Sequence, residues 1–409
     1  MKAWQFTEQP YYPAWDDTHE SLRNSLPNRH LDPKFAADLY ERYMDEWELC
    51  DELGINISIN EHHATATCIT PICHIPMAML ARNTKKVRLM SIGSPIANRP
   101  DPVRLAEEIA MIDCYSRGRH EMGFVRAGPF EVWPANAQPV GQARRFYEAY
   151  RLILKTLSTH DGPFSWEGEF FHYRAINIWP RPYQQPYPPI WFVAITAGPG
   201  AWIGEQRVKL GTFLTGRESK TLFDNYRRTW LERGWGMPPI DNFGYMGIVG
   251  VGATEEEGKR RAHQICGYIR TGAQIARQFF NPPGYLPTQA VAAGFRNSTR
   301  KDYVPAYATV VMSDGSRVYQ KTASMEQLID AQVVFAGTPD QVFQQIKAYH
   351  DDVGGCGNLL MMGHGGDMNH ADTVDNLTLF AKEVLPRLQA LKAPDYELDP
   401  KPAAKAAVA

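Results

Sequence analysis

The feature that most constrains the fold of this chain is a regular alternation of short apolar segments with longer helical patterns. Eight segments have the length and composition of strands: Lys2–Phe6, Ile55–Asn60, Val87–Ile92, Glu121–Val125, Pro189–Thr196, Gly211–Leu214, Phe243–Val251 and Leu359–Met362. Helical patterns lie between them, such as Pro33–Leu53, which Gly54 ends as a C-cap glycine would. This alternation predicts an α/β fold with a parallel sheet flanked by helices. Eight cycles favour a closed (β/α)8 barrel of the TIM type over an open doubly wound sheet.

Two stretches fall outside the cycle and account for the length of the chain. The 409 residues would suit two or three domains, but α/β barrels often exceed 250 residues as one unit. Before the fifth strand, Thr159–Gln185 predicts a small β-hairpin, and before the eighth a long insertion covers about Gly272–Val334. We therefore expect one domain over residues 1–390 and a disordered tail over 391–409, whose end is rich in Ala, Pro and Lys.

Charge and composition exclude several classes of protein. Lys and Arg number 43 and Asp and Glu 45, so the net charge of −2 argues against a nucleic-acid binder. No apolar run approaches the ~18 residues that a membrane span needs, and the N-terminus lacks the apolar core of a secretory signal. The six cysteines are scattered and predict reduced thiols. We expect a cytoplasmic protein that binds neither membrane nor nucleic acid.

Polar residues follow five of the predicted strands. Active-site groups of a barrel lie on the loops after the C-terminal ends of its strands, so these residues should converge there. They are Asn60-Glu61-His62-His63 after the second strand, Asn98-Arg99 after the third, Arg126 after the fourth, Thr196–Gly200 after the fifth, and His364 after the eighth.

His62 and His63 admit more than one interpretation. Adjacent side chains on an extended segment point to opposite faces, so at most one faces the barrel mouth. In one interpretation, both rings only satisfy hydrogen bonds within a loop. In the other, one of them is a neutral histidine that acts as general acid or base near pH 7. A metal site would need a third ligand, for which His74, His364 and Cys68 are the candidates, and no HExxH motif supports one.

The segment Thr196-Ala197-Gly198-Pro199-Gly200 follows an apolar strand and precedes a helix. Free backbone amides at a helix N-terminus, with a threonine hydroxyl beside them, form a natural phosphate site. The alternative is an ordinary Gly/Pro turn. The segment matches neither GxxxxGK[ST] nor GxGxxG, so neither an NTPase nor an ordinary dinucleotide site is indicated.

Six segments, taken in order, resemble the bacterial luciferase-like flavin-dependent monooxygenase family. They are Glu61-His62-His63; Arg104–Arg119 running into Gly123-Phe124-Val125-Arg126; the helix Ala143–Leu157; Gly168-Glu169-Phe170-Phe171; Pro180–Pro186 leading to Pro188-Pro189-Ile190-Trp191; and Phe335–Val342. The resemblance covers most of residues 1–390 apart from parts of the long insertion.

This resemblance implies an enzyme with FMN at the C-terminal ends of the barrel strands, in a homodimer or higher homo-oligomer. The FMN would arrive reduced, as FMNH2, from a separate NAD(P)H:flavin reductase. With O2 as co-substrate it would form a flavin C4a-peroxide, and one oxygen atom would enter a small, largely apolar organic substrate.

The resemblance also implies roles for particular residues. His62 falls on the catalytic histidine of the family, and Gly93-Ser94 falls on a bulge beneath the flavin ring, where the family often carries a non-proline cis peptide. Val125 stands where luciferase has a reactive cysteine, and Ile195 where it has an acidic residue. By similarity, the cofactor-binding residues are Glu61, Gly93, Ser94, Val125, Arg126, Thr196, Gly198 and Gly200.

Three other functions stay open at this point. The first is a non-catalytic flavin-binding protein on the same barrel, against which the combination of His62 and Arg126 speaks. The second is a deazaflavin-dependent oxidoreductase, although Glu-His-His favours FMN. The third is a metal-dependent hydrolase that uses His62, His63 and His364.

Overall fold

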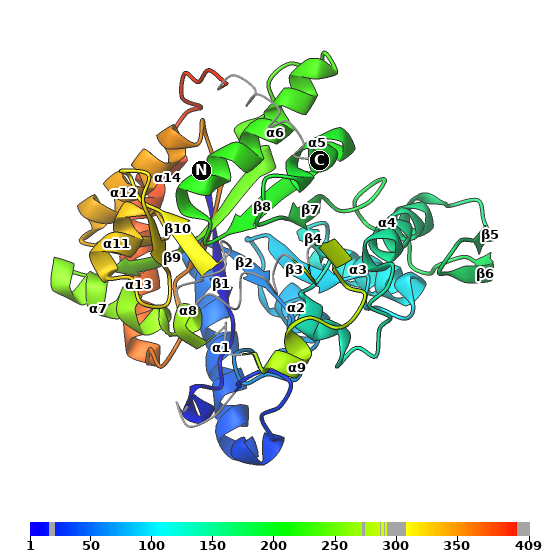
Figure 1. Cartoon of the computed structure of the whole chain (residues 1–409), viewed down its shortest axis with the longest axis horizontal. Helices are drawn as coiled ribbons and strands as arrows, with labels where there is room; N and C mark the ends of the chain where they lie inside the picture. Colours follow the sequence, from blue (N-terminus) through cyan, green and yellow to red (C-terminus); the bar gives the residue numbers. More distant parts are fainter. Residues whose placement is uncertain (16–20, 272–274, 287, 290, 293–307, 399–409) are drawn as a thin grey trace.

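Eight parallel strands form a closed barrel in the computed structural model, which describes residues 1–15, 21–271, 275–286, 288, 289, 291, 292 and 308–398 (Figure 1). The barrel strands are β1 (Lys2–Thr7), β2 (Asn56–Ile59), β3 (Leu89–Pro95), β4 (His120–Val125), β7 (Ile190–Val193), β8 (Lys209–Phe213), β9 (Phe243–Val251) and β13 (Asn358–Met362). Each strand pairs with the next in this order, and β13 pairs with both β9 and β1, which closes the ring. The predicted (β/α)8 barrel is confirmed.

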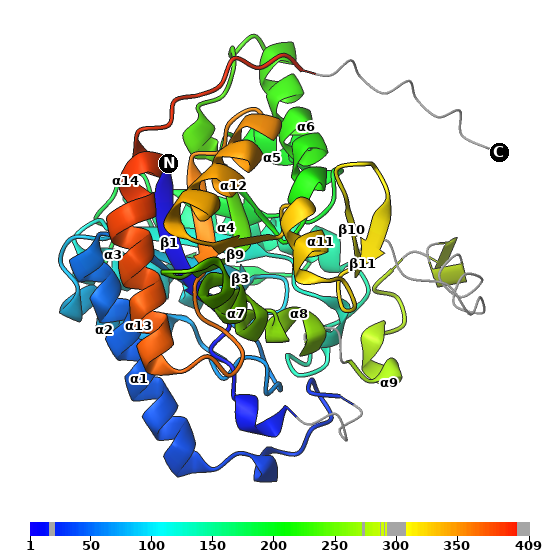
Figure 2. The ribbon, with the colours of Figure 1, turned by 90° about the vertical axis from the view of Figure 1, so that its left-hand side faces the viewer.

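Helices surround the barrel. They are α1 (Pro33–Leu53), α2 (His74–Asn83), α3 (Pro102–Ser116), α4 (Gln142–Ser158), α5 (Pro199–Gln206), α6 (Ser219–Glu232), α7 (Glu255–Ile265), α8 (Gly267–Thr271), α9 (Arg277–Phe280), α11 (Met325–Asp330), α12 (Pro339–Asp352), α13 (His370–Leu379) and α14 (Leu385–Gln389). In Figure 2, α1, α13 and α14 lie along one side of the barrel, with α11 and the β10–β11 hairpin on the other.

Helix ends are capped by residues of the types that favour these positions, among them the predicted C-cap Gly54. The Asp32 side chain accepts a hydrogen bond of 2.9 Å from the backbone N–H of Lys34 at the start of α1. Gly54 ends α1 in the left-handed conformation, with φ of 72°, which favours glycine. The Thr254 hydroxyl caps α7 by accepting from the N–H of Glu257 at 3.2 Å. These caps fix where each helix leaves the barrel wall.

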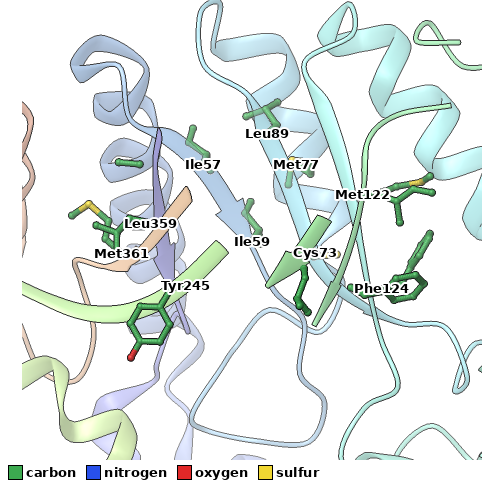
Figure 3. Close-up of a cluster of buried hydrophobic side chains, with 14 of the residues drawn as sticks. Ile57, Ile59, Cys73, Met77, Leu89, Met122, Phe124, Tyr245, Leu359 and Met361 are labelled. Carbon is green, nitrogen blue, oxygen red and sulfur yellow. The ribbon is translucent and has the colours of Figure 1, made fainter. Parts of the chain in front are cut away.

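Side chains alternate between the inside and the outside of the barrel along each strand, as the strand period of two requires. Trp4 of β1 and Trp191 of β7 meet edge to face across the interior, with ring centroids 6.2 Å apart. The neighbouring outward residues pack against the helices, among them Ile57, Leu89 and Met122 (Figure 3). Because bulky side chains fill the interior, the open ends of the strands are where a ligand can bind.

The hairpin predicted before the fifth barrel strand is present. Strands β5 (Phe164–Glu167) and β6 (His172–Ile176) pair in antiparallel fashion and precede β7. The long insertion before β13 includes a second antiparallel pair, β10 (Thr309–Val311) with β11 (Arg317–Tyr319). Residues 272–274, 287, 290 and 293–307 of the predicted insertion lie outside the described residues.

One strand was not predicted. Strand β12 (Val334–Gly337) pairs in parallel with Ile248–Val251, the second half of β9. The first half of β9, Phe243–Met246, pairs on the same edge with β8. Since β9 is nine residues long and β8 only five, β9 extends beyond its neighbour. Strand β12 pairs with the backbone groups of β9 that β8 does not reach.

The tail, for which we expected disorder over 391–409, makes contacts with the barrel helices in its first residues. The Tyr396 hydroxyl donates to the carboxylate of Asp224, at 2.8 and 2.9 Å from its two oxygens. The guanidinium carbon of Arg227 lies 4.8 Å from the Tyr396 ring centroid, and the Lys392 carbonyl lies 3.0 Å from Nε2 of His350. Tyr396 contacts α6 and the Lys392 carbonyl contacts α12, and composition did not reveal either contact. Residues 399–409 lie outside the described residues.

Among the described residues, none of the helices combines the length and the apolar character that crossing a bilayer demands.

We expect Tyr396→Ala to lower the free energy of unfolding by about 2 kcal/mol, because the ring contact with Arg227 and the hydrogen bond to Asp224 are both lost. Tyr396→Phe keeps the ring and should lose about 1 kcal/mol. Urea unfolding followed by circular dichroism measures both. Glu397→Ala changes an exposed neighbour and is the control; equal stability of Tyr396→Ala and wild type would contradict a stabilising role of the Tyr396 contacts.

Candidate functional site

The predicted site residues lie on four adjacent barrel strands. Strands β2, β3, β4 and β7 are consecutive and parallel in the sheet, so their C-terminal ends share one sector of the rim. His62 follows β2, Gly93 lies within β3, Arg126 follows β4 and Thr196 follows β7. The fold therefore brings these residues to the same face of the barrel.

The floor of this sector is the bulge predicted in β3. The pairing of β3 with β4 shifts between Ser91 and Ser94, and the peptide bond between Ile92 and Gly93 is cis, which confirms both expectations. A Cβ atom on Gly93 would lie 2.5 Å from Cγ1 of Val125. Only glycine fits, because the Val125 side chain occupies that space.

His62 is held between two carboxylates. Its Nδ1 lies 2.6 Å from Oε1 of Glu131, and its Nε2 lies 3.3 Å from Oε2 of Glu8. Glu131 comes from the 3-10 turn Pro129–Val132 after β4, and Glu8 directly follows β1. The imidazole is mostly buried, with 21% of the side chain exposed. Both ring nitrogens therefore face an acceptor.

This arrangement changes the expected protonation state of His62. Burial by itself lowers the pKa of the imidazole, but the carboxylates of Glu8 and Glu131 outweigh it and raise that pKa to about 9. The prediction of a neutral histidine near pH 7 is therefore wrong, and the ring is an imidazolium. Since the folded pKa exceeds the unfolded value of roughly 6.5, the stabilisation is complete below that value and is lost as the pH rises through about 9.

Glu61 lies beneath the rim with no exposed side-chain surface. Its carboxylate accepts hydrogen bonds from Nη2 of Arg99 at 2.9 and 3.1 Å and from Sγ of Cys73 at 3.4 Å. Nε2 of His63 lies 3.6 Å away. Burial raises the pKa of Glu61, but His63 and Arg99 lower it more, so the group stays ionised. Glu61 thus supports the loop from below, and Ser94 lies beside the same cluster, 3.9 Å from Sγ of Cys73.

Arg126 is exposed at the rim, and the late insertion reaches it. The guanidinium carbon of Arg126 lies 5.4 Å from the ring centroid of Tyr285, an insertion residue. The Tyr285 hydroxyl donates to the Ala127 carbonyl at 2.8 Å. The insertion therefore contacts the loop after β4, next to the cation that the sequence assigned to the flavin.

The predicted phosphate segment is only partly as expected. Thr196 and Gly198 are exposed, Gly198 stands at the N-terminus of α5, and a Cβ atom there would meet open space. Gly200 differs, because a Cβ atom on it would lie 2.4 Å from the Leu222 carbonyl oxygen, and its N–H donates to Ala197 at 3.3 Å. Gly200 permits close packing of α5 on α6, and its predicted phosphate contact stays a prediction.

The histidines proposed as metal ligands have separate partners. His62 contacts Glu131, His63 contacts Glu61, and Nδ1 of His364 lies 2.9 Å from the Thr7 hydroxyl. Burial lowers the pKa of His364 to about 4, so this ring is neutral. Within the described ranges, no group of three or more His, Cys, Asp or Glu side chains is placed to hold a metal ion.

Sequence reasoning missed the two carboxylates that hold His62. Glu8 stands at the C-terminal end of a strand, so the rule that selected the other candidates applied to it as well. Glu131 lies six residues beyond the end of β4, in a turn without a periodic pattern, and no sequence signal marks it. Tyr285 lies in the insertion, whose conformation has no sequence signature.

Several buried polar atoms around the rim have no hydrogen-bond partner among the described residues. They include Nδ2 of Asn60, Oδ1 of Asn98 and Nε of Arg99. Buried polar groups in native proteins are almost always paired. Together with the glycine floor, the exposed Arg126 and the open N-terminus of α5, these atoms fit a planar polar ligand that carries a phosphate.

The family model described as luciferase-like monooxygenase matches residues 32–354, and the chain belongs to this family. A flavin-dependent trigonelline monooxygenase, oxygenase component, from Acinetobacter baylyi is 34% identical over 172 residues, which are 41% of this chain and 46% of that protein. An alkanal monooxygenase alpha chain from Aliivibrio fischeri is 24% identical over 185 residues, covering 44% and 51%. The chain thus spans about half the length of the curated relatives it matches.

Solved structures share the fold over nearly the whole chain. The monooxygenase RslO1 from Streptomyces bottropensis has a TM-score of 0.69 at 20% identity, covering 95% of this chain and 99% of that one. The oxygenating constituent of 3,6-diketocamphane monooxygenase from Pseudomonas putida, in complex with FMN, has a TM-score of 0.68 at 19% identity, covering 95% and 98%.

We expect Gly93→Ala to lower the free energy of unfolding by about 1–3 kcal/mol, because the new methyl group overlaps Cγ1 of Val125. Val125→Ala removes that atom, so the double variant should be more stable than the sum of the two single effects predicts. Urea unfolding of all four proteins measures the coupling. Strict additivity would show that the two side chains do not compete for this space.

Proposed function

We propose that this chain is the oxygenase component of a two-component flavin-dependent monooxygenase. It takes reduced FMN from a separate NAD(P)H:flavin reductase and uses O2 to insert one oxygen atom into a small, largely apolar organic substrate. The observation that carries this proposal is the position of His62, a protonated histidine on the same sector of the rim as the glycine floor and the exposed Arg126. Membership of the luciferase-like family and a relative named as an oxygenase component support it.

The residues present would hold FMN at both of its ends. The Thr196 hydroxyl and the free amide end of α5 at Gly198 suit the phosphate, and Arg126 suits the anionic ring of the reduced cofactor. The ring would lie over Gly93, where Val125 leaves no room for a side chain. When bound in reduced form, FMN supplies the two electrons with which one oxygen atom of O2 enters the substrate and the other leaves as water.

The chain's own side chains have three tasks in this reaction. Apolar residues at the C-terminal ends of the strands, such as Val193 of β7 and Phe213 of β8, exclude water from the barrel mouth. They also suit a largely apolar substrate. His62 holds a proton on Nε2, the ring nitrogen that is not committed to Glu131, and can deliver it to an oxygen atom in the mouth. Tyr285 of the insertion lies where it can cover the bound flavin beside Arg126.

The first test is product analysis with photoreduced FMN, ¹⁸O2 and a substrate panel that includes trigonelline. The proposed enzyme should give a product that carries one ¹⁸O atom, without any reductase present. Release of hydrogen peroxide alone from all substrates would favour a non-catalytic flavin-binding protein. Activity with reduced deazaflavin but not with FMN would favour the deazaflavin alternative.

His62→Ala should bind FMN with affinity close to that of the wild type, as measured by flavin fluorescence quenching, yet form product about 10²–10⁴-fold more slowly. The loss follows because the substitution removes the imidazolium that would protonate the reacting oxygen. His63→Ala is the matched control, since the neighbouring ring contacts Glu61 instead. Product formation by His62→Ala at the wild-type rate would remove His62 from the mechanism.

We also propose that the enzyme is a homodimer that pairs through α2 and α3. Large apolar side chains are exposed there: Ile75 is 60% exposed, Met79 49%, Met111 43% and Tyr115 62%. A cavity of about 760 Å³ adjoins them between α1 and α2, and Tyr40 and Trp47 are among its lining residues. An apolar surface of this kind is typical of a protein–protein interface.

The variant Ile75→Glu/Met79→Glu should therefore shift the mass of the protein from dimer to monomer, because it buries charges in the paired face. Sedimentation velocity measures this shift. Leu231→Glu alters an apolar residue on α6 that is 44% exposed and serves as the control. A dimer that withstands the double change would place the interface elsewhere.

A further inference from the structure

We propose that Glu131 and Glu8 are positioning residues with different tasks. Glu131 fixes the orientation of the His62 ring through Nδ1. Glu8 contacts Nε2 and gives way when the proton on Nε2 is transferred to another oxygen. This inference rests on the proposed function only for the use of the proton. The arrangement of the three side chains stands on its own geometry.

The two contacts of His62 are unequal. Nδ1 lies 2.6 Å from Glu131, within the range of a strong charge-assisted hydrogen bond, while Nε2 lies 3.3 Å from Glu8. Glu131 is also tied to the backbone on its other side, since Oε2 accepts from the N–H of Gly128 at 2.9 Å. The Glu131 carbonyl accepts from Nδ2 of Asn98 at 3.3 Å. Glu131 is therefore fixed within its 3-10 turn, and it fixes the orientation of the imidazole.

Glu8 is held more weakly. Its Oε2 is buried and, in the part of the chain that the structure describes, makes no hydrogen bond of good geometry, so its link to His62 is an ion-pair contact only. The hydroxyl of Tyr268 on α8 faces Glu8, and burial and that carboxylate raise the pKa of the hydroxyl, which keeps it a donor. Rotation of Glu8 away from Nε2 separates a 3.3 Å contact, whereas rotation of the ring away from Glu131 would break a 2.6 Å bond, so the Nε2 proton is the one that can meet another oxygen.

The charges around His62 explain why the ring keeps this proton. The groups that face the cluster are Glu8 after β1, Glu131 after β4, Arg23 from the segment before α1, Cys68 from the segment after β2, Tyr268 from α8, and Tyr285 from the insertion. Burial raises the pKa values of the thiol and of both phenols, so these groups are neutral. Two carboxylates then face two cations, the imidazolium and the guanidinium of Arg23.

Arg23 alone does not replace the imidazolium. It is 3% exposed and its guanidinium carbon lies 4.9 Å from the Phe130 ring centroid. Within the described residues, Nε and Nη1 of Arg23 make no hydrogen bond. If His62 loses its proton, one buried carboxylate is left without a counter-charge, which is strongly unfavourable. The cluster therefore favours the protonated ring.

The direction of proton transfer follows from this asymmetry. The Nε2–H bond breaks, and the proton passes to an oxygen atom in the barrel mouth. Nδ1 keeps its own proton toward Glu131, so the ring becomes the neutral Nδ1–H tautomer. A proton from water at Nε2 restores the imidazolium, and the contact with Glu8 forms again.

The test is a titration of the His62 ring by NMR in the cofactor-free protein with ¹⁵N-labelled histidine, with the signals assigned through His62→Asn. We expect the wild-type ring to titrate with a pKa of about 9 and to keep its proton on Nδ1 at higher pH. Glu131→Gln should lower the proton affinity of the ring more than tenfold and move the remaining proton toward Nε2. Glu8→Gln should lower the affinity but leave that proton on Nδ1.

The matched control is Glu108→Gln. Glu108 contacts Nδ1 of His74 at 2.6 Å, the same distance as in the Glu131 pair, but lies outside the His62 cluster. It should leave the titration of His62 unchanged. A wild-type pKa near 6.5, or the same tautomer in both Gln variants, would overturn the assignment of separate tasks.

The outcome is separable from that of the proposed function. The titration uses no flavin and no substrate, so it succeeds or fails whether or not oxygenation is found. If oxygenation is found, its rate should fall as the pH rises through the pKa of His62, and in Glu131→Gln this fall should begin at a pH more than one unit lower. A profile that does not move while the NMR titration does would separate the His62 proton from the reaction.

Discussion

Closure of the parallel ring is the constraint on which the rest of this structure depends. Because β13 pairs with both β9 and β1, every strand points the same way around a closed circuit, and all C-terminal ends meet at one rim. Interior side chains such as Trp4 and Trp191 fill the ring from within. Chemistry is thereby confined to the rim, and residues far apart in the sequence become neighbours there.

At the rim, the protein places its ionisable groups in compensating sets. Glu61 beneath the loop is matched by Arg99 and His63, and His62 above it by Glu8 and Glu131. Burying the charges offsets part of their attraction, but at His62 the attraction outweighs burial, as its raised pKa indicates. What they provide is a fixed orientation and a fixed protonation state for a ring that stands at the mouth.

Most of the barrel was predictable because it is encoded locally. Runs such as Phe243–Val251 indicate strands, and caps such as Gly54 indicate helix ends, within a few residues of sequence. Strand β12 was not predicted because it is only four residues long and forms where β9 extends beyond β8. The prediction of a neutral His62 failed for a similar reason. The pKa of His62 depends on Glu131, which is 69 residues away in sequence and lies in a turn that no sequence pattern marks. The packing of Gly200 and of Tyr396 likewise depends on contacts with α6, which no local sequence pattern indicates.

The route of the late insertion has a consequence for how enzymes on this scaffold diversify. The insertion begins after α8, whose Ile269 packs into the barrel cluster, and ends in β12, which pairs with β9, so both of its ends are held against the barrel. Extending a loop whose ends are already fixed costs little entropy, about 0.6 kcal/mol for each doubling in length. New sequence can therefore be added beside Arg126, where Tyr285 now lies, while the barrel and the His62 cluster stay as they are.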